Sequence, residues 1–315
     1  MTQTLSTKAS LSHEERTATE PRDEGIHPVI IDCVSPVNDR IRRFRLSIKD
    51  RKPIHFLPGQ WLDVHVPGID KAGGFTITSS PRQAVSSLTN DYVPYLELAV
   101  QESPDNPPAA WLWKPAEEIT GKEVHVRVGG SFVWPPQGVD MSQIKRAIFI
   151  AGGVGINPLI SMLSFIHEQK SPIETRILYS TKAPSKATQP SEILFLPDLL
   201  DLFRKPRSHP SKDRIELFFT GTWHGPTLNR KDDEPLQPLM SQTLPFLFAD
   251  TEVPVVAWTH RIDDIALSNA VGNRDEASSS VFYVCGPPKM TDSIVGHLKK
   301  QEHIQPERVL CEKWW

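Results

Sequence analysis

The sequence predicts two domains of different class, a small antiparallel β-barrel or sandwich followed by an α/β domain with a parallel sheet. Apolar and polar residues alternate with a period of two from about residue 26 to residue 130, which is typical of half-buried strands. After Pro135 and Pro136 the pattern changes to continuous apolar strands separated by helical stretches. The length of 315 residues also fits two domains of about 150 residues each.

The chain before the first strand has several acidic residues and no apolar core. We expect residues 1–25 to be a disordered tail, because so polar a segment cannot bury enough apolar surface to fold. The lack of an apolar core argues against a secretory signal, and the acids argue against a transit peptide. The β-barrel then covers residues 26–141, and the α/β domain covers residues 142–315.

In the first domain the alternation predicts strands over residues 43–48, 62–66, 96–101 and 124–128. In the second domain an apolar strand at residues 148–151 is followed by a glycine loop and a helix over residues 159–167. Further strands are predicted at residues 176–179, 215–220, 281–285 and 308–311, and helices near residues 262–269 and 290–299. Two polar, proline-containing segments, residues 182–191 and 204–213, are predicted to be surface insertions.

The composition excludes several classes of protein. With 35 Lys and Arg against 38 Asp and Glu, the net charge of −3 gives no reason to expect a nucleic acid or an anionic membrane as partner. Three scattered cysteines exclude a disulfide scaffold and a cysteine zinc site, and they fit a reducing compartment. The uncharged run at residues 147–166 is interrupted by glycines and Pro158, which favours strand, turn and helix over a membrane span.

The glycine loop is the first candidate site. It consists of Gly152, Gly153, Val154, Gly155, Ile156, Asn157 and Pro158. Glycines let a backbone approach a phosphate, and we expect Asn157 to cap the helix and Pro158 to open it. No Lys-Ser/Thr pair follows, which excludes a nucleoside-triphosphate loop. After the second strand, Ser180 and Lys182 stand where a dinucleotide site usually has an acid. A tight turn without a ligand is the alternative.

The second candidate directly follows the strand at residues 281–284. It consists of Cys285, Gly286, Pro287 and Met290. The carboxyl end of a parallel strand is where open α/β sheets bind ligands. A buried structural cysteine is the alternative, since free cysteines are commonly buried.

Two further segments are weaker on their own. Residues 73–81 form a hydroxyl-rich strand with one aromatic, although threonine is a good strand residue in any case. The sequence ends in Glu312, Lys313, Trp314 and Trp315. The two tryptophans either fill a groove or form a planar lid over an aromatic ligand.

Taken in order, and together with the Phe-Leu-Pro-Gly-Gln signature at residues 56–60, these segments resemble the ferredoxin–NADP reductase superfamily of flavoproteins. The resemblance spans residues 26–315. It is greatest to one branch of the superfamily at the double-glycine Phe-Thr segment, at residues 128–132 and at the C-terminal Glu-Lys-Trp-Trp. It implies an FAD-binding barrel followed by an NAD(P)-binding domain.

The resemblance also implies roles for individual positions. Phe75 would lie against the flavin ring and Thr76 would face flavin N5, with further flavin contacts from Ile77, Thr78 and Ser79. The helix start at residues 106–112, including Asn106 and Ala109, would hold the FAD pyrophosphate, and the glycine turn with Ser180 and Lys182 would hold NADH or NADPH. Cys285, next to Gly286, Pro287 and Met290, would lie beside the nicotinamide. Glu312 would be the C-terminal carboxylate, and Trp314 and Trp315 would cover the flavin. Thr76, Cys285 and Glu312 are thus the candidate catalytic residues.

This chain departs from the superfamily pattern at two places. Gly74 stands where the resemblance implies the pyrophosphate arginine, and Asn106 and Ala109 replace a glycine and a serine. Helix amides would then remain as the main hydrogen-bond donors to the pyrophosphate. The chain could therefore bind FAD, bind FMN or bind no flavin.

The resulting hypothesis is a flavin-dependent oxidoreductase. It would transfer a hydride from NADH or NADPH to FAD and electrons to an unidentified acceptor, which is a separate protein or a small molecule. The alternative is a catalytically inactive nucleotide-binding sensor or scaffold. The resemblance implies a mitochondrial location, whereas the acidic N-terminal segment favours the cytoplasm.

Overall fold

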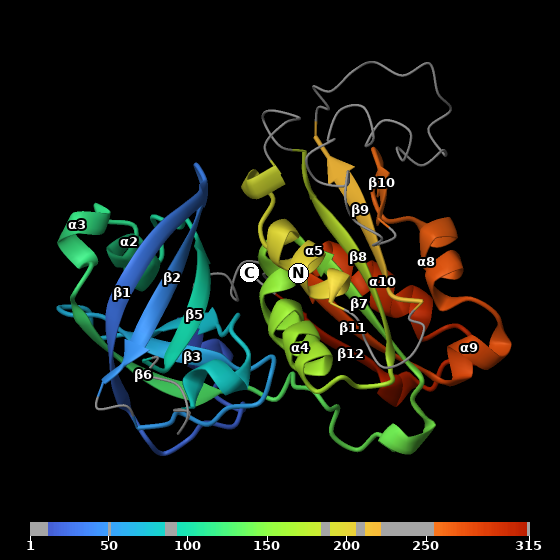
Figure 1. Ribbon diagram of the computed structural model, residues 1–315, viewed down its shortest axis with the longest axis horizontal. Coiled ribbons are helices and arrows are strands. Elements are labelled where there is room, and N and C mark those ends of the chain that lie inside the picture. The colour runs from blue at the N-terminus through green and yellow to red at the C-terminus, as the bar shows by residue number, and fades with distance from the viewer. Residues whose placement is uncertain are drawn as a thin grey trace, which may run out of the picture. The chain divides into compact units, whose positions relative to one another are not determined.

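The computed structural model describes residues 12–49, 52–85, 93–183, 190–205, 212–221 and 255–313. The chain divides into two compact units, and the division falls between Trp134 and Pro135. Each unit has its own six-stranded sheet (Figure 1).

The sheet of the first unit has the strand order β4-β3-β6-β1-β2-β5. Its strands are β1 (His27–Asn38), β2 (Ile41–Ile48), β3 (Trp61–His65), β4 (Gly73–Thr76), β5 (Tyr95–Gln101) and β6 (Glu123–Gly129). All neighbouring pairs are antiparallel. A bridge between Ile77 and Leu98 joins the continuation of β4 to β5, the two edges of the sheet. The sheet therefore closes on itself as a barrel, which confirms the predicted class.

The barrel encloses a core of alternate strand residues. Val29, Phe44, Leu62, Leu98 and Val126 are almost completely buried in it. Two short helices, α2 (Pro107–Leu112) and α3 (Ala116–Ile119), add Ala109, Leu112 and Ile119 to the same core. A short 3₁₀ helix, η2 (Pro81–Ala84), follows β4.

The N-terminal segment, defined here as residues 12–25, is folded onto the barrel. It begins with α1 (His13–Arg16), where Ser12 and Glu15 form a capping box. Further along, Arg22 pairs with Gly129, and Gly130 N donates to Pro21 O at 2.9 Å. The prediction of a disordered tail is wrong from Ser12 onward, because these polar residues are used in a cap, in backbone pairing and in ion pairs with distant parts of the chain.

The sheet of the second unit is entirely parallel, with the order β10-β9-β8-β7-β11-β12. Its strands are β7 (Arg146–Gly152), β8 (Glu174–Lys182), β9 (Arg214–Thr220), β10 (Val255–Trp258), β11 (Ser280–Gly286) and β12 (Val309–Lys313). Every residue of β7 and β11 is buried, as expected for central strands between two helical layers.

Helices cover both faces of this sheet (Figure 1). They are α4 (Ile156–Glu168), α5 (Leu196–Arg204), α8 (Asp264–Val271), α9 (Arg274–Ser278) and α10 (Pro288–Leu298), with 3₁₀ turns η3 (Met141–Gln143), η4 (Gly153–Gly155), η5 (Pro190–Glu192) and η6 (Pro306–Arg308). Residues of α8 and α10 share a core with Ile148, Phe282 and Val284, whereas α4 packs on β7 and β11 and against α5. The α/β class is therefore confirmed. The predicted surface insertions lie partly outside the described residues.

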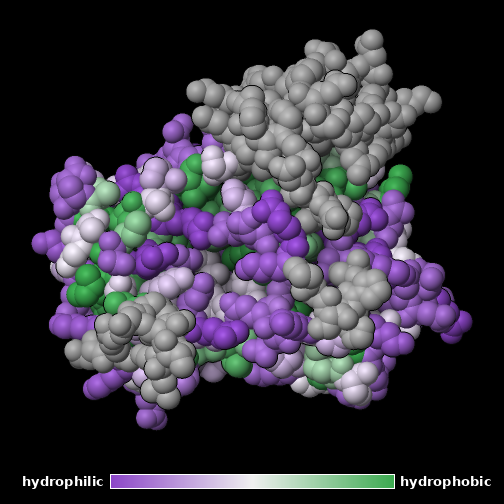
Figure 2. Space-filling view, viewed as in Figure 1, coloured by the Kyte–Doolittle hydropathy of each residue, from purple (hydrophilic) through white to green (hydrophobic). Residues whose placement is uncertain are grey.

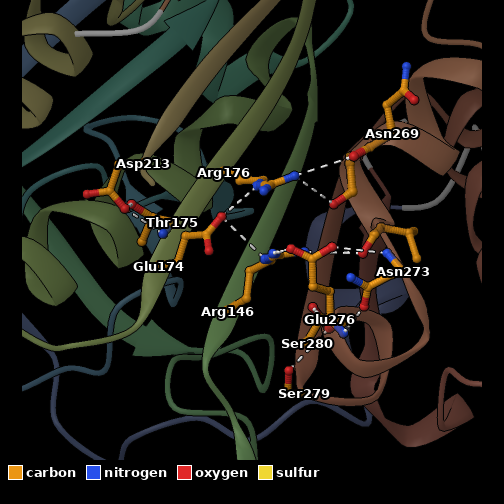
Figure 3. Close-up of polar contacts among 12 residues, drawn as sticks. Arg146, Glu174, Thr175, Arg176, Asp213, Asn269, Asn273, Glu276, Ser279 and Ser280 are labelled. Carbon is orange, nitrogen blue, oxygen red and sulfur yellow. Dashed lines mark hydrogen bonds and ion pairs between the residues drawn. The ribbon is translucent and has the colours of Figure 1, made fainter. Parts of the chain in front are cut away.

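The starts of the strands are tied to α8 and α9 by a network of ion pairs (Figure 3). Arg146, which is 4% exposed, pairs with Glu276 at 2.5 Å and donates to Val271 O at 3.2 Å. Arg176 pairs with Glu174 at 2.7 Å and donates to Ala270 O at 3.3 Å. The two guanidinium groups thus satisfy carbonyls at the C-terminal end of α8, which the helix itself leaves without partners. This network lies at the edge of the sheet opposite the glycine turn.

Most of the described surface in Figure 2 is hydrophilic, with apolar residues in small separate groups. The exposed large apolar residues are Ile26, Leu57, Val93 and Ile265. None of the described helices is both long and apolar enough to cross a bilayer. Nor do the described ranges contain a cluster of His, Cys, Asp or Glu suited to a metal ion.

Candidate functional site

Strand β4 presents two faces of different character. Phe75 pairs in register with Leu62, and both side chains belong to the barrel core, where Phe75 is 8% exposed. Thr76 pairs with Trp61 and Gly74 with Asp63 on the other face. Since successive strand residues point to opposite faces, the Phe75 ring and the Thr76 hydroxyl do not face the same side. Of the predicted flavin residues, Phe75 and Ile77 belong to the core and Thr76 and Thr78 to the opposite face.

The hydroxyl groups of Thr76 and Thr78 are buried without a protein partner. The two residues are 1% and 4% exposed, and neither Oγ1 has a hydrogen-bond partner in the described part of the chain. By contrast, Ser79 Oγ accepts from Glu97 N at 3.0 Å. A buried hydroxyl without a hydrogen bond costs about 1–3 kcal/mol. The two threonines are therefore the candidates on this strand for bonds to a polar ligand.

The signature at residues 56–60 fixes the backbone next to these threonines. The Gln60 side chain accepts from Leu57 N at 2.7 Å and donates to Gly130 O at 3.1 Å. Gln60 O in turn accepts from Ile77 N at 3.0 Å. The loop therefore holds the segment between Thr76 and Thr78 in place through backbone contacts.

The helix start predicted to bind the pyrophosphate has no amide available. Asn106 caps α2, and its Oδ1 accepts from Ala109 N at 3.4 Å. The two positions between them are Pro107 and Pro108, which have no N–H. The next amide, Ala110 N, donates to Asn106 O at 2.8 Å. The expectation that helix amides remain as the main anion donors is therefore wrong, because prolines and the cap remove them.

The two glycines before Phe75 have no room for a side chain. A Cβ on Gly74 would lie 2.1 Å from the ring of His13, and a Cβ on Gly73 would lie 2.6 Å from the Phe75 ring and 2.7 Å from Pro108 Cβ. As packed here, neither position accepts an arginine. The loss of the expected arginine is thus coupled to the N-terminal segment, whose His13 occupies the space over Gly74.

His13 is held there by a buried carboxylate. Asp63, which is fully buried, lies 3.1 Å from His13 Nε2, 2.9 Å from Arg22 Nε and 2.7 Å from Arg127 Nη2. Burial alone would raise the pKa of Asp63, but the hydrogen bonds from His13, Arg22 and Arg127 outweigh it and hold that pKa well below its usual value. Arg22 and His13 also contact the Trp61 ring. This cluster fastens the N-terminal segment to β3 and β6.

In the second unit, the three glycines of the turn have two different tasks. A Cβ on Gly155 would lie 2.2 Å from Cys285 O, and one on Gly152 would lie 2.7 Å from Met290 Sδ. These two glycines are therefore required by packing against β11 and α10. Gly153 has a φ of 54°, in the left-handed region, and nothing within 4 Å of an added Cβ. Only this glycine leaves the backbone open for a ligand to approach.

The helix after the turn starts earlier than predicted. The glycines form η4, in which Ile156 N bonds to Gly153 O, and α4 begins at Ile156 with Gly155 as its N-cap. Asn157 and Pro158 are buried inside the first turn of α4, so the prediction of an Asn157 cap and an opening Pro158 is wrong. The tight glycine turn made the side-chain cap unnecessary.

The candidate residues of the second unit gather at the carboxyl edge of its sheet. Cys285 is fully buried and pairs in register with Ala151 on one side and Glu312 on the other. Gly152 pairs with Ser180, and the exposed Lys182 lies at the end of the same strand. Gly286 precedes Pro287, and its carbonyl accepts from Thr291 Oγ1 at 3.2 Å. The structure thus brings Cys285, Glu312, Ser180 and the glycine turn together. Trp314 and Trp315 lie outside the described residues.

Comparison with known proteins identifies the family. No protein-family model matches the chain. The Xenopus laevis protein named oxidoreductase NAD-binding domain-containing protein 1 is 32% identical over 315 residues, covering 99% of this chain and 86% of the relative. The human protein of that name is 30% identical over 319 residues, covering 100% of this chain and 88% of the relative. The chain belongs to the oxidoreductase NAD-binding domain-containing protein 1 family. This is the branch to which residues 73–81, 128–132 and 312–315 are most similar.

Solved structures show the same two-domain architecture as this family member. The FAD/NAD-binding domain of nitric oxide dioxygenase from Vibrio cholerae has a TM-score of 0.60 at 13% identity, covering 91% of this chain and 98% of that one. A ferredoxin–NADP⁺ reductase from Neisseria gonorrhoeae has a TM-score of 0.55 at 15% identity, covering 92% and 99%. The fold is therefore that of the ferredoxin–NADP reductase type, as the motifs predicted.

Sequence reasoning missed the Asp63 cluster next to β4. Asp63 was interpreted only as the polar half of an alternating strand, and His13 and Arg22 fell in the segment predicted to be disordered. An acid flanked by Leu62 and Val64 was a weak signal that a buried partner must exist, but the sequence did not show which residue supplies it.

Proposed function

We propose that this protein is an NAD(P)H-dependent flavoprotein oxidoreductase. In this proposal NADH or NADPH binds at the carboxyl edge of the parallel sheet, and a flavin binds at Thr76 and Thr78 of the barrel. The observation that carries the proposal is the pair of buried threonine hydroxyls without protein partners. A fold neighbour named as a ferredoxin–NADP⁺ reductase with bound FAD and NADP supports it, as does a more distant relative named as the reductase component of propane 2-monooxygenase.

The residues present are suited to bind the flavin ring, but they are less suited to bind the flavin phosphates. The hydroxyls of Thr76 and Thr78 would bond to the polar edge of the ring system, and the backbone up to Ser79 would lie behind it, with Phe75 and Ile77 on the core side of the strand. No matching site exists at Asn106 and Ala109, because both amides are already bonded and the two prolines between them have no N–H. We therefore assign no role to a pyrophosphate contact there.

On the nucleotide side, the open backbone at Gly153 would receive the pyrophosphate, with Ser180 and Lys182 beside the ribose. Cys285 and Glu312 would border the nicotinamide, since they lie in one row of the sheet next to the glycine turn. When bound, a flavin accepts a hydride from the nicotinamide and passes the electrons on. The chain's own task is to bind the flavin with residues of the first unit and the nucleotide with residues of the second.

The direct test is an absorbance spectrum of the purified protein under argon, before and after addition of NADH or NADPH. We expect flavin bands, present as purified or after adding flavin, that bleach on addition of the nucleotide. Bands that persist unbleached with both nucleotides, or protein that takes up no flavin, would favour the alternative.

That alternative is an inactive nucleotide-binding sensor or scaffold. It is favoured by one observation, the loss of both the arginine position and the helix amides beside β4. It leaves the buried hydroxyls of Thr76 and Thr78 without explanation. The acceptor, and the choice between mitochondrial and cytoplasmic location, stay predictions.

A further inference from the structure

The surface of β4 next to Thr76 is covered on the side of Gly74. Gly74 lies on the same face as Thr76, two residues earlier, and the His13 ring covers it. His13 is held in this position, because its Nε2 lies 3.1 Å from Asp63 Oδ1 and its ring packs edge-on against Trp61. A ligand bonded to the threonine hydroxyls therefore cannot extend along the strand toward Gly74.

The start of α2, which also lies next to β4, offers no site for an anion. Gly73 is in contact with Pro108, so the start of α2 lies next to β4. Its first amides are absent or bonded, as described above. The preceding residue, Asp105, is exposed and acidic. A carboxylate at this point repels a phosphate, whereas the usual anion site at a helix start offers free N–H groups.

The two guanidinium groups that surround Asp63, the register partner of Gly74, are already engaged. Arg22 donates to Asp63, to Thr17 O at 2.6 Å and to Thr17 Oγ1 at 2.5 Å. Arg127 donates to Asp63 through both Nε and Nη2. These guanidinium groups neutralise a buried carboxylate of the same chain, which leaves little of their charge for a ligand.

We infer that the barrel recognises the ring and ribityl chain of a flavin without recognising its phosphates. This inference rests on the proposed function and narrows its ligand. Riboflavin, FMN and FAD then bind with similar affinity, and the bound flavin exchanges with free flavin. In that case flavin is a substrate: NADH or NADPH gives up a hydride, oxidised flavin takes up that hydride and a proton from solvent, and reduced flavin leaves as the electron carrier.

The test is a titration of the full-length, flavin-free protein with riboflavin, FMN and FAD, followed by flavin fluorescence at low and high sodium chloride. We expect three dissociation constants within about threefold of one another, with no systematic salt dependence. A tenfold or greater preference for FMN or FAD that weakens with salt would overturn the inference, since Arg22, Arg127 or another cation would then bind phosphate. Such a result would leave the proposed function standing.

Failure of all three flavins to bind to folded protein would instead overturn both the inference and the proposed function. Thr78→Val serves as the site variant, because it replaces the hydroxyl by a methyl group of the same shape. We expect it to weaken all three flavins by the same factor. Thr120→Val, at an exposed hydroxyl that bonds to Ala116 O, is the matched control and should leave binding unchanged. An effect of Thr78→Val confined to FMN and FAD would contradict the inference.

Discussion

At the scale of single residues, the Thr76 hydroxyl allows a test of whether it binds a ligand or only supports the fold. Its buried Oγ1 has no partner within the described ranges, so the folded protein loses free energy by keeping it there. We predict that Thr76→Val raises the unfolding free energy of the flavin-free protein by about 1 kcal/mol. The same change should slow single-turnover reduction of bound flavin by roughly 100-fold, the usual effect of losing one transition-state hydrogen bond.

Both effects are measurable on one preparation, by urea unfolding and by stopped-flow absorbance. Thr120→Val is again the control. If Thr76→Val destabilised the protein and left the reduction rate unchanged, the hydroxyl would be structural and the mechanism would not include it.

Lys182 offers a residue-scale test of nucleotide choice. It is exposed at the end of β8, and its register partner is Thr220. A lysine there would attract the 2′-phosphate of NADPH, while no acid stands at this strand end to bind a free ribose hydroxyl. We expect the protein to use both nucleotides and Lys182→Ala to lower the efficiency with NADPH more than with NADH. An unchanged ratio of kcat/KM for the two nucleotides would assign the lysine to the solvated surface.

The candidate residues were predictable where a single short segment carries the chemistry. The hydroxyls of residues 76–79 and the Cys285 turn are such segments, although their roles came from a resemblance and not from spacing alone. His13, Arg22 and Asp63 were not predictable, because the reason for each lies in another part of the chain. The same holds for Gly152 and Gly155, which must be glycines because Met290 and Cys285 leave no room for a side chain.

At the scale of elements, the N-terminal segment depends on one carboxylate. Asp63 receives hydrogen bonds from His13, Arg22 and Arg127, which hold its pKa below the usual value. A lowered pKa in the folded state contributes stability above the unfolded pKa of about 3.9, and this stability is lost as the pH falls below that value. We predict that Asp63→Asn destabilises the protein at pH 7 by about 3–5 kcal/mol, since it leaves buried cations without their partner.

Urea unfolding at pH 7 and at pH 3 checks both parts of this prediction. The difference between the natural protein and Asp63→Asn should shrink at the lower pH, because Asp63 then becomes protonated first in the unfolded chain. A difference that is equal at the two pH values would show that the carboxylate charge is not what fastens the segment.

The glycine turn gives a matched pair of variants within one element. Gly155→Ala places a methyl group 2.2 Å from Cys285 O, where only backbone could give way. Gly153→Ala meets no atom and is opposed only by its left-handed φ of 54°, at a cost of about 1–2 kcal/mol. We predict that Gly155→Ala prevents folding of the second unit, whereas Gly153→Ala folds and binds NADPH at least tenfold more weakly.

Circular dichroism and nucleotide titration distinguish these outcomes. If Gly153→Ala bound NADPH normally, the turn would be the ligand-free structural turn that the sequence also allowed. If Gly155→Ala folded normally, the packing of η4 against β11 would have to be more adaptable than the described contacts indicate.

At the scale of the whole molecule, the sequence was informative because each unit repeats one simple pattern. Alternation with a period of two predicted the antiparallel strands, and continuous apolar runs such as residues 148–151 predicted the parallel ones. Closure of the barrel through Ile77 and Leu98 was not predictable, since it joins strands that are neighbours only in space. Strand β10, of only four residues, was too short to stand out from its surroundings.

The two separate cores lead to a final prediction about cooperativity. One core contains only residues before Trp134 and the other only residues after Pro135, so a change in one core need not act on the other. We predict two calorimetric transitions. Flavin should raise and Asp63→Asn should lower the midpoint of one transition, while NADP⁺ should raise the midpoint of the other, because a ligand stabilises only the unit that binds it. One transition that responds to all three changes would instead mean that the units unfold as a single cooperative structure. Each ligand would then stabilise the whole chain against unfolding.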